Sequence, residues 1–400
     1  MQRKDTNTLY AIILFCTIWV YYSLNARYIN FSLMTILRWV FPFTLIGIAV
    51  LLSNGRISVP PMLFWWFSIA VLAPSVLGAD PVTSIVKYCS WVLIFYGCYI
   101  YFMELRTEKS IHQCMSLLSA VLVIFQCINF VFVTLGINED NGRSTGITTN
   151  ANTLGIYSNL AFWAGIYFHR QQKDGPMKLL WLLFFGTTVF TTLASGSRMA
   201  FVIIGINIVA YAYMTMENRR RFWALVAGMA VLAVLVINGK LNFLGISAVE
   251  RLSQEGGTSR EELWEIGLNV WRENKLFGVG YTVSARFNTE VKNLVFHNSY
   301  ISFLAECGLW GVVFFALGMV PVIVQIVRFF RKPQFIRTHP EFSIAFVMLF
   351  VLAISAWSES FMFAVGSTEG FTFWFLLAWM WAYVQKKDVF SEKEGEQINE

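Results

Sequence analysis

The sequence predicts an all-α, polytopic integral membrane protein with about twelve transmembrane helices. Of its 400 residues, 56% are hydrophobic and only 14% are charged, whereas charged residues make up roughly 25% of soluble domains. The mean hydropathy is +0.57. Apolar runs long enough to cross about 30 Å of hydrocarbon as helices recur along nearly the whole chain. A water-soluble globular protein could not bury this much apolar surface.

The expected spans follow from these apolar runs, with boundaries placed to within several residues. They cover residues 9–24, 32–53, 61–78, 85–104, 111–136, 153–168, 177–194, 199–215, 222–238, 299–327, 341–357 and 366–385. The first run is as short as a signal peptide, but it lacks a small-x-small cleavage site before Asn25 and further spans follow it. We therefore expect it to be a retained helix.

The orientation is predicted from Lys and Arg, because positive residues in short loops are retained in the cytoplasm. Arg3 and Lys4 place the N-terminus inside, and every second loop after it is basic. The basic loops contain Arg56; Arg106 and Lys109; Arg170, Lys173 and Lys178; Arg219, Arg220 and Arg221; Arg328, Arg331, Lys332 and Arg337; and Lys386 and Lys387. Both termini are thus predicted to be cytoplasmic, and the net charge of +6 reflects topology rather than binding to nucleic acid.

A single transmembrane domain is expected over residues 1–390, with one long extracytoplasmic loop at about 239–298. Ser259 and Glu262 form a capping box, which predicts the start of a helix in this loop. Apolar residues then recur on one face, so the helix would be amphipathic and would lie on the membrane surface or on the helix bundle. The polar end, 391–400, is predicted to be a disordered cytoplasmic tail.

His297 is the one histidine predicted on the outer face, where the long loop enters a span. An imidazole exchanges a proton near neutral pH, so His297 is a candidate general base. The alternative, an interfacial histidine that caps a helix, is equally compatible with this residue taken alone. Glu306 and Glu262 are lesser candidates for the base.

Arg260 stands in the first turn of the predicted amphipathic helix. Free backbone N–H groups and the helix dipole favour an anion at this position, so phosphate binding is physically natural. The alternative is a solvated arginine paired with a nearby glutamate.

Further cations lie toward the predicted outer face. Arg198 follows an outer boundary between two spans, where an unpaired charge is costly. Arg38 and Lys87 lie inside spans near their outer ends, where they could snorkel, form local ion pairs or line a common cavity. Arg143 and Asn152 belong to a stretch rich in Gly, Ser, Thr and Asn that first indicates a turn. Without a DxD or HExxH pattern, this set suits a diphosphate held by arginines, with no metal and no cofactor.

These motifs resemble the O-antigen ligase and polymerase superfamily of bacterial surface-polysaccharide enzymes. His297, Asn298, nine intervening residues, Gly308 and Gly311 fit its H-[NSQ]-x9-G-x-x-G signature. The supporting blocks are Arg143 to Gly155, similar to R-x-x-G-x-x-x-N-x-N; Ser195 to Arg198, similar to SGSR; Ser259 and Arg260 with Trp264; and Leu276 to Tyr281, similar to a G-x-G before the histidine.

The resemblance implies a GT-C-like glycosyltransferase architecture in the bacterial inner (plasma) membrane and a donor glycan on undecaprenyl diphosphate. It implies that Arg198 and Arg260 hold the diphosphate and that His297 activates the acceptor hydroxyl. The candidate substrate-binding residues are Arg143, Asn152, Asn298, Arg38 and Lys87. The acceptor would be lipid A core for a ligase or a growing glycan for a polymerase, and no motif decides between them.

A transporter or flippase of a lipid-linked saccharide is the alternative function. It would also need about twelve helices and outward-facing cations, but it predicts polar residues along both halves of the membrane. Here the polar clusters gather near the predicted outer face, which favours an enzyme.

Overall fold

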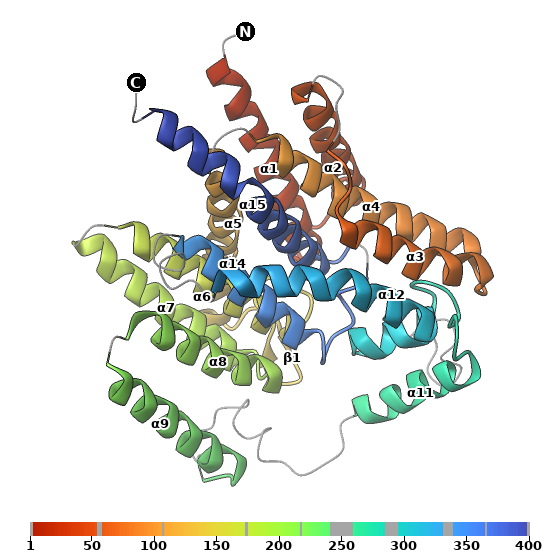
Figure 1. The fold of residues 1–400 in the computed structure, drawn as a ribbon. Helices are drawn as coiled ribbons and strands as arrows, with labels where there is room; N and C mark the ends of the chain where they lie inside the picture. Colours follow the sequence, from red (N-terminus) through yellow and green to blue (C-terminus); the bar gives the residue numbers. More distant parts are fainter. Residues whose placement is uncertain are drawn as a thin grey trace. The chain divides into compact units, whose positions relative to one another are not determined.

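The computed structural model describes residues 3–53, 58–105, 108–172, 175–216, 218–240, 259–284, 295–330, 339–364 and 366–397. These residues form helices and one small hairpin of two strands, each two residues long (Figure 1). The helices are α1 (Arg3–Leu24), α2 (Ser32–Leu52), α3 (Met62–Leu77), α4 (Pro81–Glu104), α5 (Glu108–Thr134), α6 (Ala151–Gln171), α7 (Pro176–Ala194), α8 (Arg198–Thr215), α9 (Arg219–Ile237), α11 (Ser259–Glu273), α12 (Ser299–Phe330), α14 (Pro340–Ser355) and α15 (Thr368–Gln397). The hairpin pairs β1 (Glu139–Asp140) with β2 (Arg143–Ser144).

The predicted fold class, an all-α polytopic membrane protein, is confirmed. Within the described part of the chain, six helices are long and apolar enough to cross a membrane. They are Ser32–Leu52, Pro81–Glu104, Lys109–Thr134, Pro176–Ala194, Arg198–Thr215 and Ser299–Arg328. Shorter apolar helices occupy Leu9–Leu24, Met62–Leu77 and Pro340–Ser355, where three more spans are expected. The total of twelve spans and the GT-C-like arrangement stay predictions.

The chain divides into two compact units. Unit 1 comprises Met1–Leu24, Phe31–Leu117 and Gly257–Glu400, and unit 2 comprises Asn25–Asn30 and Leu118–Gly256. The single domain over 1–390 therefore stays a prediction. Helix α15 extends to Gln397, so its backbone continues into the polar end that we expected to be disordered.

An aromatic cluster forms the core of unit 1. Phe67 of α3 is fully buried at its centre. Its ring contacts those of Trp91, Tyr281, Phe303, Phe315, Phe363 and Trp374. These rings come from α4, α12, α15 and the connecting segments. The buried Phe67 ring of α3 therefore packs these elements against one another.

Helix α12 is broken near its start. Gly308 has φ 62° and ψ −164°, which no helical residue adopts. The break frees backbone N–H groups, and the preceding chain supplies their acceptors: Leu309 N donates to Lys275 O at 2.9 Å and Trp310 N to Leu276 O at 3.0 Å. The residues from Lys275 to Tyr281 thus run alongside the break, and we call them the bracing segment.

The bracing segment is bonded on both of its sides. Val279 N and Gly280 N donate to the carbonyls of Ala305 and Glu306 in α12. On the other side, Ala79 N donates to Val279 O. Gly278 has φ 67°, and a Cβ there would collide with the α12 backbone. Gly278 therefore permits close packing against the α12 backbone, and Gly280, with φ 114°, lies beside Gly78.

Tyr281 ends the bracing segment inside the core. Burial raises the pKa of its hydroxyl well above the ordinary value, so this group stays protonated and acts as a donor. It donates to Phe363 O at 3.0 Å, and Tyr281 O accepts from Ser84 Oγ at 3.0 Å. The segment is thereby anchored to α4 and to the chain before α15.

Unit 2 is built around α6, which packs against α7 and α8. A buried polar network joins α6 to α8: Asn207 accepts from Trp163 Nε1 at 2.9 Å and donates to Asn159 Oδ1 at 2.8 Å. Asn159 in turn donates to Ala200 O at 3.1 Å. Because these buried groups satisfy one another, the network fixes the register of the two helices.

Gly308→Ala is expected to destabilise unit 1. The added Cβ would collide with the Leu276 carbonyl, and the φ and ψ of Gly308 lie in a region essentially restricted to glycine, where another residue costs about 1–3 kcal/mol before any clash is counted. We expect a lower melting temperature and less monodisperse protein in detergent. Gly186→Ala is the matched control, because nothing lies within 4 Å of a Cβ there. Equal melting temperatures for Gly308→Ala and the wild type would contradict the bracing role.

Candidate active site around Glu359

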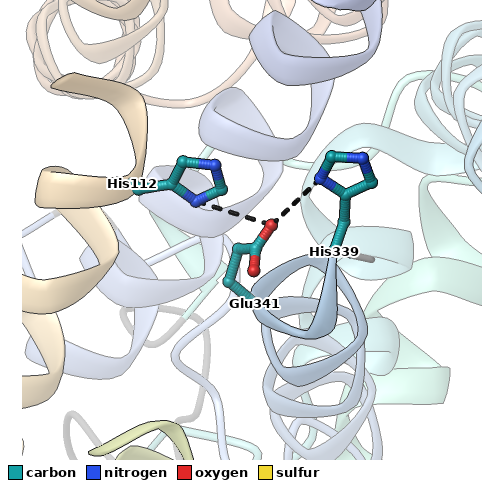
Figure 2. Close-up of side chains that lie close together, drawn as sticks. All are labelled: His112, His339 and Glu341. Atoms are coloured by element: carbon teal, nitrogen blue, oxygen red, sulfur yellow. Dashed lines mark ion pairs between the residues drawn. The ribbon is translucent and has the colours of Figure 1, made fainter. Parts of the chain in front are cut away.

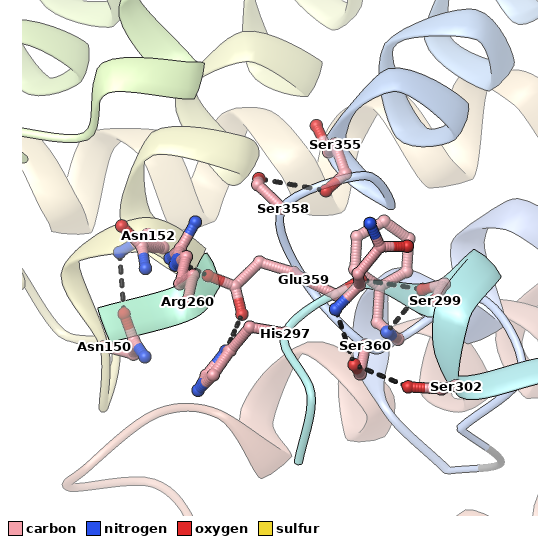
Figure 3. A network of polar contacts seen from close by, with 12 residues as sticks. Asn150, Asn152, Arg260, His297, Ser299, Ser302, Ser355, Ser358, Glu359 and Ser360 are labelled. Carbon is pink, nitrogen blue, oxygen red and sulfur yellow. Dashed lines mark hydrogen bonds and ion pairs between the residues drawn. The ribbon is translucent and has the colours of Figure 1, made fainter. Parts of the chain in front are cut away.

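A single carboxylate in unit 1 joins two residues that are distant in sequence. Arg260 Nη2 donates to Glu359 Oε1 at 2.8 Å, and His297 Nδ1 lies 3.0 Å from Glu359 Oε2 (Figure 3). The side chains of Arg260, His297 and Glu359 are 26%, 27% and 16% exposed. The trio is therefore half-buried, yet a substrate could reach it.

The first turn of α12 holds the backbone around Glu359. Ser299 Oγ donates to Glu359 O at 2.7 Å and accepts from Phe361 N and Met362 N, each at 3.1 Å. Ser299 N donates to Ala356 O at 2.8 Å. One serine thus fixes both sides of the residue that carries the carboxylate.

Asn298 acts here as the cap of α12. Its Oδ1 accepts from Tyr300 N at 2.9 Å and Ile301 N at 3.1 Å, as an N-cap side chain does. Its own backbone N donates to Ser360 Oγ at 3.0 Å. The residue before it, His297, has φ 48°, an uncommon left-handed conformation for a residue other than glycine. The cap and this turn together direct the imidazole to Glu359.

Glu359 also determines which nitrogen of His297 can act as a base. An ionised carboxylate can only accept a hydrogen bond, so the network assigns the proton of a neutral imidazole to Nδ1. Nε2 then carries the lone pair. No hydrogen bond to Nε2 is found among the described residues. The imidazole is thus held in the form that can take a proton from a hydroxyl.

The amphipathic helix α11 carries Arg260. It begins at Ser259, where the capping box predicts a helix start; the side chain of Ser259 lies outside the described part. Leu263 and Val270 are buried, and Gly267 lies against Ile301 of α12. Of the two predicted positions, on the membrane or on the bundle, the structure places this face on the bundle.

Aromatic side chains hold α11 to the chain near Glu359. The ring of Trp264 meets that of Trp357 edge-on at 6.1 Å, and Trp357 also contacts Tyr300. Arg260 is thereby brought to Glu359 by packing as well as by charge. The guanidinium has five N–H donors, and its bond to Glu359 leaves donors for an anion.

Glu359 was missed by the sequence analysis. It lies between the spans expected at 341–357 and 366–385, in a short loop that the predicted topology places on the outer face with His297 and Arg260. An acidic residue in such a loop, flanked by two serines, was the available signal. Nothing in its sequence spacing indicates a contact with residues 62 and 99 positions away.

A second polar group belongs to unit 2. Asn141 and Gly142 both have positive φ and form the tight hairpin turn between β1 and β2. Arg143 then donates from Nε to Ser195 O at 2.8 Å and from Nη2 to Asn152 Oδ1 at 2.7 Å. The structure thus brings together two of the sequence motifs, and Arg143 braces the turn that precedes Arg198.

Arg198 is the first residue of α8. Ser197 caps the helix by accepting from Ala200 N, and Gly196, with φ 57°, makes the turn before it. Arg198 Nε is buried and has no hydrogen-bond partner among the described residues. A cation at a helix N-terminus with an unused donor is suited to an anion.

Arg38 and Lys87 lie on α2 and α4 of unit 1. The Arg38 guanidinium stacks over the Trp39 ring at 4.9 Å. Among the described residues, neither forms a hydrogen bond or ion pair with the Glu359 group. Their assignment as substrate-binding residues, like those of Arg143, Asn152 and Asn298, stays a prediction.

The family model Wzy_C, described as O-antigen ligase, matches residues 182–316. The matched range contains Arg198, Arg260, His297 and the glycines of the bracing segment, and it supports the resemblance drawn from the motifs. Glu359 and Arg143 lie outside it. A comparison with curated proteins finds no match.

Proposed function

Because residues 182–316 match the O-antigen ligase family model, we propose that this chain transfers a glycan from undecaprenyl diphosphate to a sugar hydroxyl. The transfer would take place on the extracytoplasmic face of the bacterial inner membrane, with both termini in the cytoplasm. The observation that carries the proposal is the Glu359 carboxylate between His297 and Arg260. A candidate base beside a cation supports the proposal, because a transfer of this kind needs both groups.

The proposed reaction is a single inverting displacement. The acceptor oxygen forms a bond to the anomeric carbon of the donor sugar as the bond from that carbon to the diphosphate oxygen breaks. The hydroxyl proton passes to His297 Nε2, and undecaprenyl diphosphate leaves. Diphosphate is a good leaving group, so oriented guanidinium donors suffice to stabilise its developing charge without a metal ion.

Glu359 is proposed as a positioning residue. Its carboxylate holds Nδ1–H, so that Nε2 faces the acceptor, and it stabilises the imidazolium that forms during transfer. It also restrains the plane of the Arg260 guanidinium.

Two arginines are proposed to contact the donor diphosphate. Arg260 has N–H donors for which the described residues show no acceptor, but its charge is paired with that of Glu359. Arg198 is proposed because of its motif and because of its surroundings in unit 2. Its positive charge has no carboxylate partner among the described residues. The acceptor is either lipid A core or another glycan chain.

The proposal is tested with the full-length protein in liposomes, a lipid-diphosphate glycan, and lipid A core or glycan acceptors. Release of undecaprenyl diphosphate with formation of the glycoside is expected, also in the presence of EDTA. Movement of the donor across the bilayer without release of lipid diphosphate would instead favour a flippase.

His297→Ala is expected to abolish transfer while the donor still binds. Loss of the base removes a contribution of typically 10²- to 10⁴-fold in rate. His297→Gln keeps a hydrogen-bonding side chain that cannot take the proton, so it should be similarly slow. His169→Ala, in unit 2, is the control and should keep the wild-type rate. Substantial activity in His297→Gln would show that the base lies elsewhere.

Arg260→Ala and Arg198→Ala should each reduce turnover strongly in folded, inserted protein, because each removes a cation from the leaving diphosphate. Lysine should restore activity only in part, since it lacks the guanidinium fork. Arg272→Ala, an exposed position on the same helix as Arg260, is the matched control. Wild-type rates in both alanine variants would exclude the proposed role.

Glu359→Gln is expected to slow transfer with little change in donor binding. The glutamine can offer its amide oxygen to Arg260 and its NH₂ to His297 Nδ1, which would shift the proton to Nε2 and block the base. The loss should approach that of His297→Gln, within the range of about 10²- to 10⁴-fold for general base catalysis. Glu261→Gln, exposed on α11, is the control. A wild-type rate for Glu359→Gln would remove Glu359 from the mechanism.

A further inference from the structure

A second cluster of titratable side chains lies at the other end of α14. His112 comes from the start of α5, His339 immediately precedes α14, and Glu341 is in its first turn (Figure 2). One ligand atom from each of these residues lies within 4.8 Å of the others. All three residues belong to unit 1, and the sequence analysis expected no metal ligand among them.

The distances in this cluster do not fit hydrogen bonds. Glu341 Oε1 lies 3.5 Å from His112 Nδ1 and 3.5 Å from His339 Nδ1, whereas ordinary hydrogen bonds between such atoms measure about 2.7–3.2 Å. These two separations are close to the edge of a tetrahedron of ligands around Zn²⁺, about 3.4 Å for metal–ligand bonds of about 2.0–2.2 Å, and the two histidine ligand atoms lie within 4.8 Å of each other. Glu341 Oε1 therefore lies at ion-pair distance from both imidazole nitrogens (Figure 2), at a spacing that also leaves room for an ion bound to all three atoms.

The carboxylate is the observation that needs an explanation. Glu341 is only 7% exposed, and its Oε1 is buried without a hydrogen-bond partner in the described part of the chain. Burying an acceptor in this way costs free energy, so native proteins leave few such groups unsatisfied. The N-terminus of α14 favours the negative charge, but it does not supply Oε1 with a partner.

We propose that His112, His339 and Glu341 bind a divalent transition metal ion, for which Zn²⁺ is the best fit. Two imidazole nitrogens and one carboxylate oxygen are a known set of three zinc ligands, with a fourth position left for water. A dication would satisfy the buried carboxylate and join α5 to α14. Mg²⁺ fits less well, because it prefers oxygen ligands in octahedral geometry.

Tyr383 of α15 closes one side of the cluster. Its ring contacts both imidazoles edge-on, that of His112 at 5.9 Å and that of His339 at 5.8 Å. Its hydroxyl is 2.6 Å from His339 Nδ1. A metal on Nδ1 would take the lone pair to which this hydroxyl can donate, so the Tyr383 hydroxyl competes with the metal. Tyr383→Phe should therefore bind the ion at least as tightly as the wild type.

The test measures bound metal in the full-length protein, carrying a tag without histidine or cysteine. The protein is stripped with EDTA, exchanged into chelator-free buffer, incubated with Zn²⁺ and passed through gel filtration before elemental analysis. About one zinc per chain is expected for the wild type, and its melting temperature should rise with Zn²⁺, because the ion binds the folded state.

The variants separate coordination from packing. His112→Ala and Glu341→Gln should lose the zinc and the thermal shift, whereas His112→Cys should retain zinc because a thiolate is a zinc ligand. His169→Ala is the matched control and should bind like the wild type. Equal zinc in the wild type, His112→Ala and Glu341→Gln, or none in the wild type, would overturn the proposal. Neither measurement uses substrate, so the result is independent of the proposed transfer reaction.

Discussion

Backbone groups inside a membrane protein must find partners within the protein, because hydrocarbon offers none. A break in a spanning helix is therefore tolerated only where other chain segments satisfy the freed groups. At Gly308 the bracing segment provides these partners through the carbonyls of Lys275 and Leu276. The requirement for close backbone approach explains the glycines at 278 and 308. It also fixes the first turns of α12, and with them the position of His297.

The Glu359 pairs are better explained by function than by stability. Removing two charges from water costs about as much as their attraction returns, and surface-accessible pairs contribute roughly 0–1 kcal/mol. With side chains 16% to 27% exposed, this trio lies between those cases and adds little net stability. What it supplies is preorganisation. Ser299 fixes the chain on both sides of Glu359, and the packing of α11 fixes Arg260. The N–H donors of Arg260 are therefore already oriented before a substrate binds.

Helix positions could be predicted from the sequence because they depend on local apolar runs and caps. The span expected at 299–327 matches α12 (Ser299–Phe330), and the helix expected from the capping box begins at Ser259. The break inside α12 was not predicted, since it arises from a contact with the bracing segment. In the stretch expected to form a turn, residues 141–155, the structure has a hairpin turn at Asn141 and Gly142, whereas Ala151 and the residues after it belong to α6. The contact of Arg143 with Ser195 is tertiary. The contacts of Glu359, and those among His112, His339 and Glu341, were not predicted for the same reason. The pattern of a single sequence carries no information on which side chains folding brings together.

Helix α14 connects the two polar clusters of unit 1, with Glu341 in its first turn and Glu359 just past its end. Its 16 residues span about 24 Å at 1.5 Å per residue, so the clusters share no ligand and no solvent shell. A metal at one end could still act on the other by shifting the helix. However, Ser299 and Ser360 anchor the Glu359 end to α12 independently of α5. Sites this far apart without shared partners are usually energetically additive. Metal occupancy should therefore stabilise the junction of α5 and α14 while leaving the geometry of His297 and Arg260 unchanged.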